Sequence, residues 1–409
     1  MILRRLLLAA VLFLGFVQQA AAAPMLALVG GTIVVPDRAT TVRADVLIDR
    51  DRIAKVGRNL RLPRGTKVVN VRGRYLVPGL WDMHAHIAAI GPPGGAPERY
   101  VGYGVLGIRD MGGHLDVLTQ LRRSISDGTR IGPDIYMAGP TLNGEAAADF
   151  HRVVKTDAEA RAAVRELKAA GVDFIKIHRQ TTREAFFAIA DETRRQDLTF
   201  VGHVPLVLDW ITASNAGMRT IEHIQTMAEN DQVKRADPVA TAFATADRLK
   251  KGYADKIFAV MAKNHTYFTP TLVGYEDTWK NDAPERAALK QKFYAEMKSL
   301  VLNAKRAGVP ILAGTDVLER HGDMLLTELE RLVAVGLTPA EALAAATTTP
   351  RGLTGRGPGR IGKGEEASLL ITDKNPLADV RNLRALRAVI LRGRPIDAAE
   401  LRRLQAIRD

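Results

Sequence analysis

VPGLWDMHAH, residues 77–86, is the stretch of this 409-residue chain that decides its fold, because it predicts an apolar β-strand ending in two histidines. Side chains two residues apart on a strand point to the same side, so His84 and His86 can reach one metal ion together. An HxH pair also arises by chance or on protein surfaces. The interpretation therefore depends on what the rest of the chain adds to it.

Outward from this stretch, residues 79–354 alternate short apolar strands with amphipathic helices, a pattern typical of βα units and a parallel sheet. Capping-box sequences at Thr156–Glu159, Thr181–Glu184 and Thr338–Glu341 mark three helix starts. Eight parallel strands close a barrel, so we predict an α/β fold built on a (β/α)8 TIM-like barrel. The expected strands are Leu80–His84, Val105–Asp110, Asp134–Ala138, Phe174–His178, Thr199–His203, Thr220–His223, Thr266–Thr269 and Pro310–Ala313.

The two flanks of the barrel region, residues 25–78 and 355–405, read instead as short strands separated by turns. Leu26–Val35 near the start and Ala388–Leu391 near the end are apolar and rich in β-branched residues. Strand-forming segments on both sides of a barrel suggest that they pair with each other. We therefore expect one small β-sandwich, composed of both flanks, beside a hydrolase barrel.

The N-terminus has the order of a secretory signal peptide. Arg4 and Arg5 precede the apolar run Leu6–Val17, and small residues follow at Ala20–Ala23. The apolar run is shorter than the ~20 residues that span a bilayer. We expect a Sec-type signal peptide at residues 1–22, a mature chain with no membrane span, and a periplasmic or secreted protein; the alternative is an uncleaved membrane anchor.

Composition limits the partners and the ligand types. The chain has no cysteine, so it forms no disulfide, and any metal site must use His, Asp, Glu or a modified Lys. The formal charge of +13 is scattered in short pairs such as Arg122-Arg123, without a basic block, which argues against nucleic acid as a partner. We expect a small-molecule substrate and leave open whether the chain forms a homo-oligomer.

Further residues of metal-ligand type lie at the ends of other predicted strands. Lys176 lies among apolar residues in the fourth strand, where an amine must pair, lose its proton or be modified. His203 ends the fifth strand, His223 ends the sixth, and Asp316 follows the eighth. The carboxyl ends of barrel strands converge on one face, where catalysis takes place. Together with the HxH pair, these residues predict a metal site on that face.

In these motifs the chain resembles the amidohydrolase superfamily, and within it the group similar to imidazolonepropionase and to metal-dependent Xaa-Pro dipeptidases (prolidases). The resemblance runs from residue 26 to residue 400. The motifs that carry it are VPGLWDMHAH (77–86), IRDMGG (108–113), the lysine strand (173–178), GTD (314–316) and GRIGKG (359–364).

The resemblance implies a hydrolase with two divalent metal ions, for which histidine and carboxylate ligands favour zinc. It also implies that the buried lysine combines with CO2 to give a carbamate that bridges the ions. A hydroxide between the ions would attack an amide carbonyl, and the aspartate would pass its proton to the leaving amine. The implied ligands are His84, His86 and Asp316 for one ion, His203 and His223 for the other, and carbamylated Lys176 for both.

Other residues are candidates for contact with the substrate. His178 lies on the inward face at the exit of the fourth strand, and we expect it to act in catalysis at the substrate carbonyl. His114 and His151, in loops after the second and third strands, are candidates for substrate binding. Arg109 and Asp110 read as a structural ion pair.

The substrate itself is left open by the sequence. Close relatives often have a Thr-Thr pair where this chain has Leu106-Gly107, and it lacks a Gly-Gly-His loop after the third strand. Our first hypothesis is a two-metal enzyme that cleaves a dipeptide or an N-acyl amino acid. The alternatives are a single-metal hydrolase of cyclic amides, a lactonase, and a non-catalytic envelope protein. Lys176 favours the first, because a single ion needs no bridging carbamate. Two expected insertions, residues 226–253 and 274–302, border the predicted site.

Overall fold

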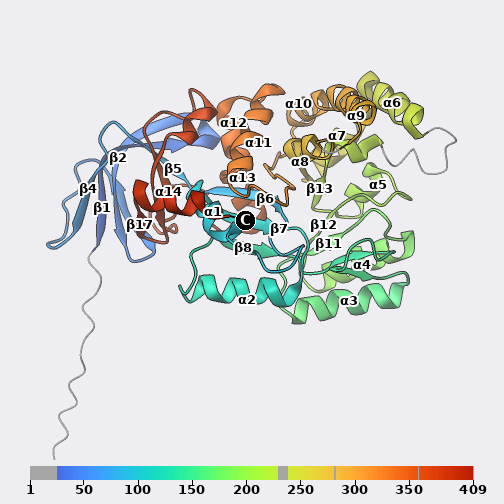
Figure 1. Cartoon of the computed structure of the whole chain (residues 1–409), viewed down its shortest axis with the longest axis horizontal. Coiled ribbons are helices and arrows are strands. Elements are labelled where there is room, and N and C mark those ends of the chain that lie inside the picture. The colour runs from blue at the N-terminus through green and yellow to red at the C-terminus, as the bar shows by residue number, and fades with distance from the viewer. Residues whose placement is uncertain (1–24, 229–237, 281, 358, 409) are drawn as a thin grey trace, which may run out of the picture.

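The computed structural model describes residues 25–228, 238–280, 282–357 and 359–408, and Figure 1 shows their arrangement. The predicted signal peptide at residues 1–22 lies outside the described residues. A sheet domain, blue with red elements from the other end of the chain, stands beside a larger α/β region that runs from cyan to orange (Figure 1).

The α/β region contains parallel strands in two hydrogen-bonded groups, one of three strands and one of six. Within each group, strands that are neighbours along the barrel pair in parallel. The strands are β6 (Leu80–Ala85), β7 (Val105–Asp110), β8 (Asp134–Met137), β9 (Thr141–Asn143), β10 (His151–Val153), β11 (Ile175–Ile177), β12 (Phe200–Gly202), β13 (Thr220–Glu222) and β14 (Tyr267–Thr269).

Backbone contacts connect the two groups into a (β/α)8 barrel. On one side, Asp173 donates its backbone N–H to Met137 at 2.8 Å, which places β11 next to β8. On the other side, Phe268 bridges Ile311 in parallel, and the Met83 N–H donates to the Ala313 carbonyl at 2.8 Å. The predicted eighth strand, residues 310–313, thus lies between β14 and β6, and the predicted fold class is confirmed.

Helices cover the outside of the barrel, as the alternating pattern predicts (Figure 1). Two predicted capping boxes are present, at Thr156 and Thr338. The third was assigned one residue early: Thr182 caps its helix, and the Thr181 hydroxyl instead donates to the His178 carbonyl at 2.7 Å. The helices of the α/β region outside the two insertions are α1 (Ala96–Gly102), α2 (Leu115–Ser126), α3 (Asp157–Ala169), α4 (Arg183–Arg195), α5 (Trp210–Asn215), α7 (Ala254–Lys263), α10 (Ser299–Arg306), α11 (Asp323–Ala334), α12 (Pro339–Ala345) and α13 (Thr348–Thr354).

Both flanks of the barrel join one mixed sheet of eight strands. The order of the strands is β17-β16-β15-β5-β1-β2-β3, and β4 pairs with the first part of β1, residues 26–29. The C-terminal strand β15 thus pairs with the N-terminal strand β5. Buried Leu28, Val46, Leu76 and Leu369 form its own apolar core. The strands are β1 (Leu26–Val35), β2 (Thr40–Asp49), β3 (Arg52–Gly57), β4 (Lys67–Asn70), β5 (Tyr75–Pro78), β15 (Leu369–Thr372), β16 (Leu386–Leu391) and β17 (Arg394–Ile396), and the short helices are η1 (Pro36–Arg38), η4 (Val380–Arg384) and α14 (Ala398–Ala406).

The two insertions pack against each other at the end of the barrel remote from the flanking sheet (Figure 1). Across their interface, Phe243 and Phe293 meet edge to face with ring centroids 5.6 Å apart; within the second insertion, the rings of Trp279 and Tyr294 lie 5.6 Å apart. Among the described residues, no helix is long and apolar enough to cross a membrane. The insertion elements are η2 (Ile224–Ala228), α6 (Pro238–Arg248), η3 (Leu249–Tyr253), α8 (Leu272–Asp277) and α9 (Pro284–Met297).

Candidate metal centre

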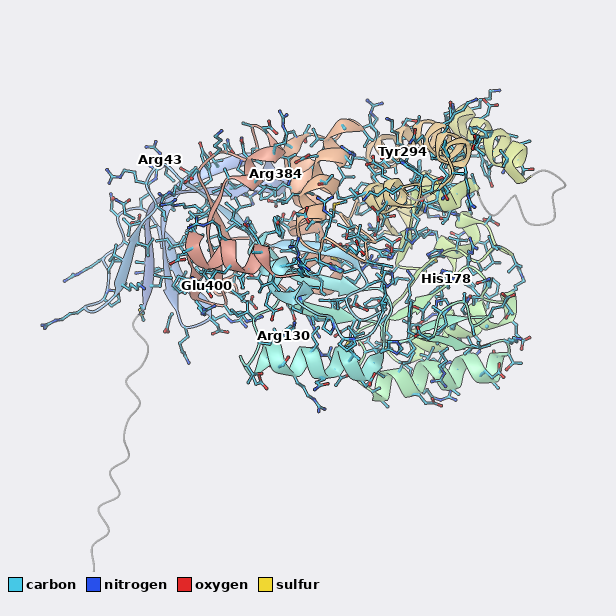
Figure 2. All side chains as sticks on the ribbon, in the orientation of Figure 1. Arg43, Arg130, His178, Tyr294, Arg384 and Glu400 are labelled. Carbon is cyan, nitrogen blue, oxygen red and sulfur yellow. The ribbon has the colours of Figure 1, made fainter. Side chains whose placement is uncertain are left out.

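The barrel brings the predicted ligands together around one cavity, which we call the inner cavity and which has a volume of about 320 Å³. Lys176 comes from the middle of β11, and the others stand at or just after the carboxyl ends of β6, β12, β13 and the segment 310–313. His178 lies with β11 and β12 in the barrel, away from the flanking sheet (Figure 2). The predicted residues that line the inner cavity are His84, His86, His151, Lys176, His178, His203, His223 and Asp316.

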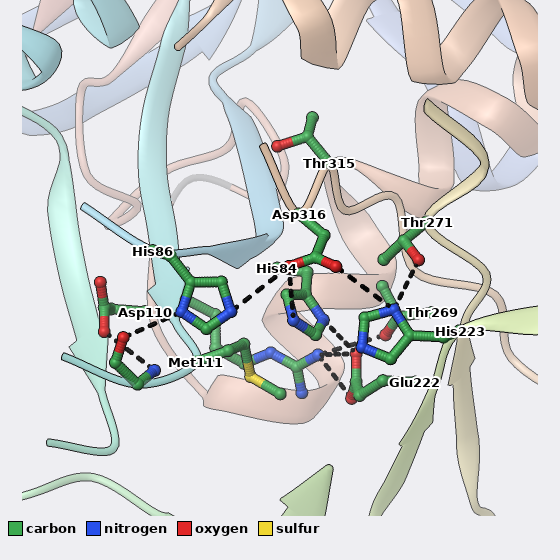
Figure 3. A network of polar contacts seen from close by, with 12 residues as sticks. His84, His86, Asp110, Met111, Glu222, His223, Thr269, Thr271, Thr315 and Asp316 are labelled. Atoms are coloured by element: carbon green, nitrogen blue, oxygen red, sulfur yellow. Dashed lines mark hydrogen bonds and ion pairs between the residues drawn. The ribbon is translucent and has the colours of Figure 1, made fainter. Parts of the chain in front are cut away.

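The two histidines of the HxH pair present the same ring nitrogen to Asp316 (Figure 3). His84 donates its Nδ1 hydrogen to Glu222 at 2.9 Å, and His86 donates its own to the Gly112 carbonyl at 2.9 Å. Because these acceptors take the Nδ1 hydrogens, Nε2 is the nitrogen that carries the lone pair when each ring is neutral. The Nε2 atoms lie 3.4 Å and 3.3 Å from Asp316 Oδ1, respectively.

Asp316 and His223 complete the tightest group. His223 Nδ1 lies 3.5 Å from Asp316 Oδ2 and 2.8 Å from the Thr271 hydroxyl (Figure 3). One donor atom each from His84, His223 and Asp316 lie within 4.8 Å of one another, close enough to share an ion. Both His223 and Asp316 have positive φ, 68° and 54°, a backbone conformation that is uncommon for non-glycine residues.

A second group of imidazoles continues from His223. The His203 ring centroid lies 4.4 Å from that of His223 and 4.3 Å from that of His178. The Nδ1 atoms of His178 and His203 are buried without a hydrogen-bond partner among the described residues. A buried polar nitrogen without a partner is costly, so these atoms fit a bound ion or substrate better than a sealed core.

Lys176 reaches the same cavity from the middle of β11. Its side chain is buried and passes against Gly202 of the neighbouring strand, where a Cβ atom would lie 2.8 Å from the lysine Cδ. Burial lowers the pKa of the lysine to about 8. A larger share of the amine is therefore uncharged near neutral pH than in an exposed lysine, and an uncharged amine is what CO2 reacts with.

The electrostatics suit a cation. Burial lowers the pKa of His223 to about 4 and that of His178 to about 3, so both rings are neutral at neutral pH, as metal coordination requires. Burial alone would lower the pKa of His86, but the hydrogen bond and the charge of Asp316 outweigh it, so the pKa of this ring is raised. Burial would raise the pKa of Asp316, yet the contacts with His223 and His86 lower it, so Asp316 is a carboxylate. The neutral rings of His178 and His223 beside the Asp316 carboxylate fit a divalent ion of the zinc type.

Sequence reasoning missed the buried pair beneath this centre. The predicted ion pair between Arg109 and Asp110 does not form, because adjacent strand residues face opposite sides. Arg109 donates instead to Glu222 at 3.0 Å, and Glu222 is the acceptor that holds His84. Asp110 accepts backbone N–H groups, from Ile87 at 2.9 Å and from Gly112. The sequence offered one signal for this pair: Glu222 directly precedes His223, a predicted metal ligand.

Two further residues were missed. Asp82 accepts hydrogen bonds from the Thr315 N–H at 3.0 Å, the Thr315 hydroxyl at 2.7 Å and the His84 N–H at 3.2 Å. It thereby ties the strand of the HxH pair to the loop that carries Asp316. Gln225 also lines the inner cavity, and its buried amide oxygen has no hydrogen-bond partner among the described residues.

The two candidate substrate-binding histidines lie at the edges of the centre. His151 lines the inner cavity, and its Nδ1 lies 3.5 Å from the Asn143 side-chain nitrogen. His114 lines a neighbouring cavity of about 620 Å³ and pairs with Asp149 at 3.6 Å. The structure thus places both beside the centre, and neither among the group closest to Asp316.

Comparison with known proteins finds relatives that match most of this chain. The chain is 28% identical over 362 residues to an uncharacterized protein of Mycobacterium tuberculosis, which covers 79% of this chain and 85% of that protein. It is 23% identical over 440 residues to an ochratoxinase of Aspergillus niger, covering 87% of this chain and 83% of that protein.

Solved structures share the fold. A Xaa-Pro dipeptidase with methionine bound in its active site superposes with a TM-score of 0.73 at 21% identity, covering 91% of this chain and 100% of that one. The Aspergillus niger ochratoxinase superposes with a TM-score of 0.72 at 22% identity, covering 92% and 96%. The model of the amidohydrolase family, whose members generally use divalent metals, matches residues 75–396. The chain belongs to the amidohydrolase family and is a hydrolytic enzyme that acts on amide bonds.

Proposed function

We propose that the protein cleaves the amide bond of a dipeptide or an N-acyl amino acid, using two divalent ions, preferably zinc. The observation that carries the proposal is the convergence of six imidazoles, one amine and one carboxylate on the inner cavity. A non-catalytic envelope protein has no use for such a set, because each buried nitrogen without a partner costs free energy.

The ligands divide into two groups by position. His84, His86 and Asp316 would hold one ion, and His203 and His223 the other. Lys176 would bridge them after its amine attacks CO2, which forms an N–C bond, releases one proton and leaves a carbamate with two oxygen ligands. When bound, the ions would supply a water of low pKa as nucleophile and polarise the substrate carbonyl.

Asp316 has the position of the proton carrier. Its carboxylate lies between the histidines of both groups, 3.3 Å from His86 and 3.5 Å from His223. It would accept the proton of the attacking water at one oxygen and pass it to the nitrogen of the leaving amine. His178, a neutral imidazole beside His203, would orient the substrate carbonyl by a hydrogen bond.

A hydrolysis screen tests the proposal. Purified, metal-loaded protein is offered dipeptides, N-acyl amino acids, cyclic amides and lactones, each with and without prior treatment by a chelator. The proposal expects metal-dependent release of amine from the first two classes. A clean preference for lactones, or equal rates after metal removal, would contradict it.

We also propose that residues 1–22 are removed on export. The order of charged, apolar and small residues supports this, and a cysteine-free chain needs no disulfide outside the cell. Sequencing the N-terminus of protein from the periplasm tests it. A mature protein that begins at residue 23 is expected, and an intact N-terminus in a cytoplasmic fraction would contradict it.

A further inference from the structure

Two cavities meet at the candidate metal centre. The inner cavity and its neighbour of about 620 Å³, which we call the outer cavity, share His86, Ala148, Phe150 and Asp316 as lining residues. The Phe150 ring lies between the histidines, with centroids 6.2 Å from His86 and 5.1 Å from His151. A molecule whose amide reaches Asp316 can therefore extend past Phe150 into the outer cavity.

The outer cavity has an apolar wall that water reaches. Ile90 is 78% exposed and Leu318 is 49% exposed, and both line it together with Ala89 and Phe150. Exposed large apolar side chains gathered at a concave site are characteristic of a binding surface, because leaving them in water is unfavourable.

Few ionisable side chains line the outer cavity away from the metal centre. Away from the metal centre, the ionisable side chains among its described lining residues are His114 and Asp149, which lie 3.6 Å apart. A group bound between Ile90, Phe150 and Leu318 would therefore meet mainly apolar surface, with the two ionisable side chains in contact with each other. The chemistry suits an uncharged aliphatic or aromatic group.

We propose that the outer cavity binds an apolar substituent of the substrate, so that the enzyme prefers amides with a bulky aliphatic or aromatic group on one side of the scissile bond. This inference rests on the proposed function, because it places that bond at Asp316. Ile90, Phe150 and Leu318 are then specificity-determining residues. The cavity volume is in the range of sites that take drug-sized ligands.

The test uses two series of amides with the full-length, zinc-loaded protein. One series lengthens the acyl group from acetyl to octanoyl with a fixed amine, and the other lengthens the amine side with a fixed acetyl group. In one of the two series, each added methylene should raise kcat/KM about three- to fourfold until the cavity is filled. Equal kcat/KM along both series would overturn the proposal.

Variants locate the effect. Leu318→Ala and Ile90→Ser should lower the ratio of kcat/KM between the longest and shortest substrates by about fivefold or more, since each removes apolar contact. Val207→Ala is the matched control, because Val207 is 57% exposed and lines neither cavity. The proposal fails if the control changes the ratio as much as the cavity variants do.

A binding measurement separates this proposal from the proposed function. Calorimetry with n-alkylphosphonates of increasing chain length reports on the outer cavity whether or not any amide is hydrolysed. Affinity that rises with chain length in wild type and much less in Leu318→Ala supports the outer cavity, even if every amide resists hydrolysis and the proposed function fails. Affinity independent of chain length overturns the outer cavity, even if a small amide is hydrolysed and the proposed function stands.

Discussion

Glu222 accepts the Nδ1 hydrogen of His84 across 2.9 Å, with both side chains fully buried. Arg109 donates to the same carboxylate at 3.0 Å and to the Met83 carbonyl at 2.6 Å, so three strands, β6, β7 and β13, are tied beneath the metal centre. The contact fixes the His84 tautomer and directs Nε2 towards Asp316. The geometry of the centre thus depends on a residue that does not line the inner cavity.

Glu222→Gln should weaken metal binding about 10- to 100-fold, because an amide cannot hold His84 and neutralise Arg109 as a carboxylate does. The loss of a buried ionic partner should also lower the free energy of unfolding by about 3 kcal/mol. Competition with a coloured chelator measures the affinity. Glu192→Gln, which alters a buried carboxylate on α4 remote from the centre, should leave metal affinity unchanged; equal effects of both variants would refute the positioning role.

Asp316→Asn should retain metal and lose activity. The amide oxygen can still coordinate, but it cannot carry a proton, so kcat should fall about 100- to 10,000-fold. Metal content and kcat are measured on the same preparation. Asp255→Asn, which alters an exposed carboxylate on α7, serves as control. Near-normal turnover in Asp316→Asn would remove the aspartate from the proton-transfer role.

Lys176→Arg should bind less than two ions per chain, because a guanidinium does not form a stable carbamate. Wild type refolded with 13C-labelled bicarbonate and zinc should give a carbamate signal in a 13C NMR spectrum, and the variant should give none. Lys168→Arg, an exposed lysine on α3, should behave as wild type. Two ions per chain in Lys176→Arg would show that no bridging carbamate is needed.

The metal-free protein should lose stability on acidification. The pKa of His223 is lowered to about 4 and that of His178 to about 3, so between these values and about pH 6.5 the unfolded chain binds protons that the folded chain does not. The free energy of unfolding should therefore fall as pH decreases through that range, by up to about 1.4 kcal/mol per pH unit for each ring.

A variant that lacks His223 separates this effect from that of buried carboxyl groups, which change the free energy of unfolding with pH in the opposite direction. Burial raises the pKa of Glu328 to about 8 and that of Asp82 to about 6, and these carboxyls lower stability as pH rises above their unfolded values. Urea unfolding of wild type and His223→Asn after metal removal, at about pH 5 and about pH 7, gives the difference. An identical pH dependence in both proteins would contradict the claim that His223 takes up a proton on unfolding in this pH range.

Much of the centre could be predicted because its residues stand at strand ends with local signals. His84 and His86 share a face by the two-residue period of a strand, and Lys176 is conspicuous as a charge within an apolar strand. The eighth strand was also recognised, although only Ile311 forms a bridge there. Such features follow from short-range order and from the rule that barrel strand ends converge.

The supporting contacts could not be predicted because they join distant parts of the chain. Arg109 and Glu222 are 113 residues apart, and Asp82 and Thr315 are 233 apart. Arg109 was assigned to its neighbour Asp110 by proximity in sequence, whereas the pleat turns the two side chains to opposite faces. The outer cavity was equally hidden, since Ile90 and Leu318 come from loops after strands on opposite ends of the sequence.

The most direct test of the account is to titrate zinc into chelator-treated, bicarbonate-equilibrated protein while following hydrolysis of an N-acyl amino acid. The account predicts no turnover without metal and a rise in rate that levels off at two ions per chain, with no comparable rise in Asp316→Asn. Full hydrolysis by metal-free protein, or a rate that levels off at one ion, would contradict the two-ion centre formed by His84, His86, Lys176, His203, His223 and Asp316.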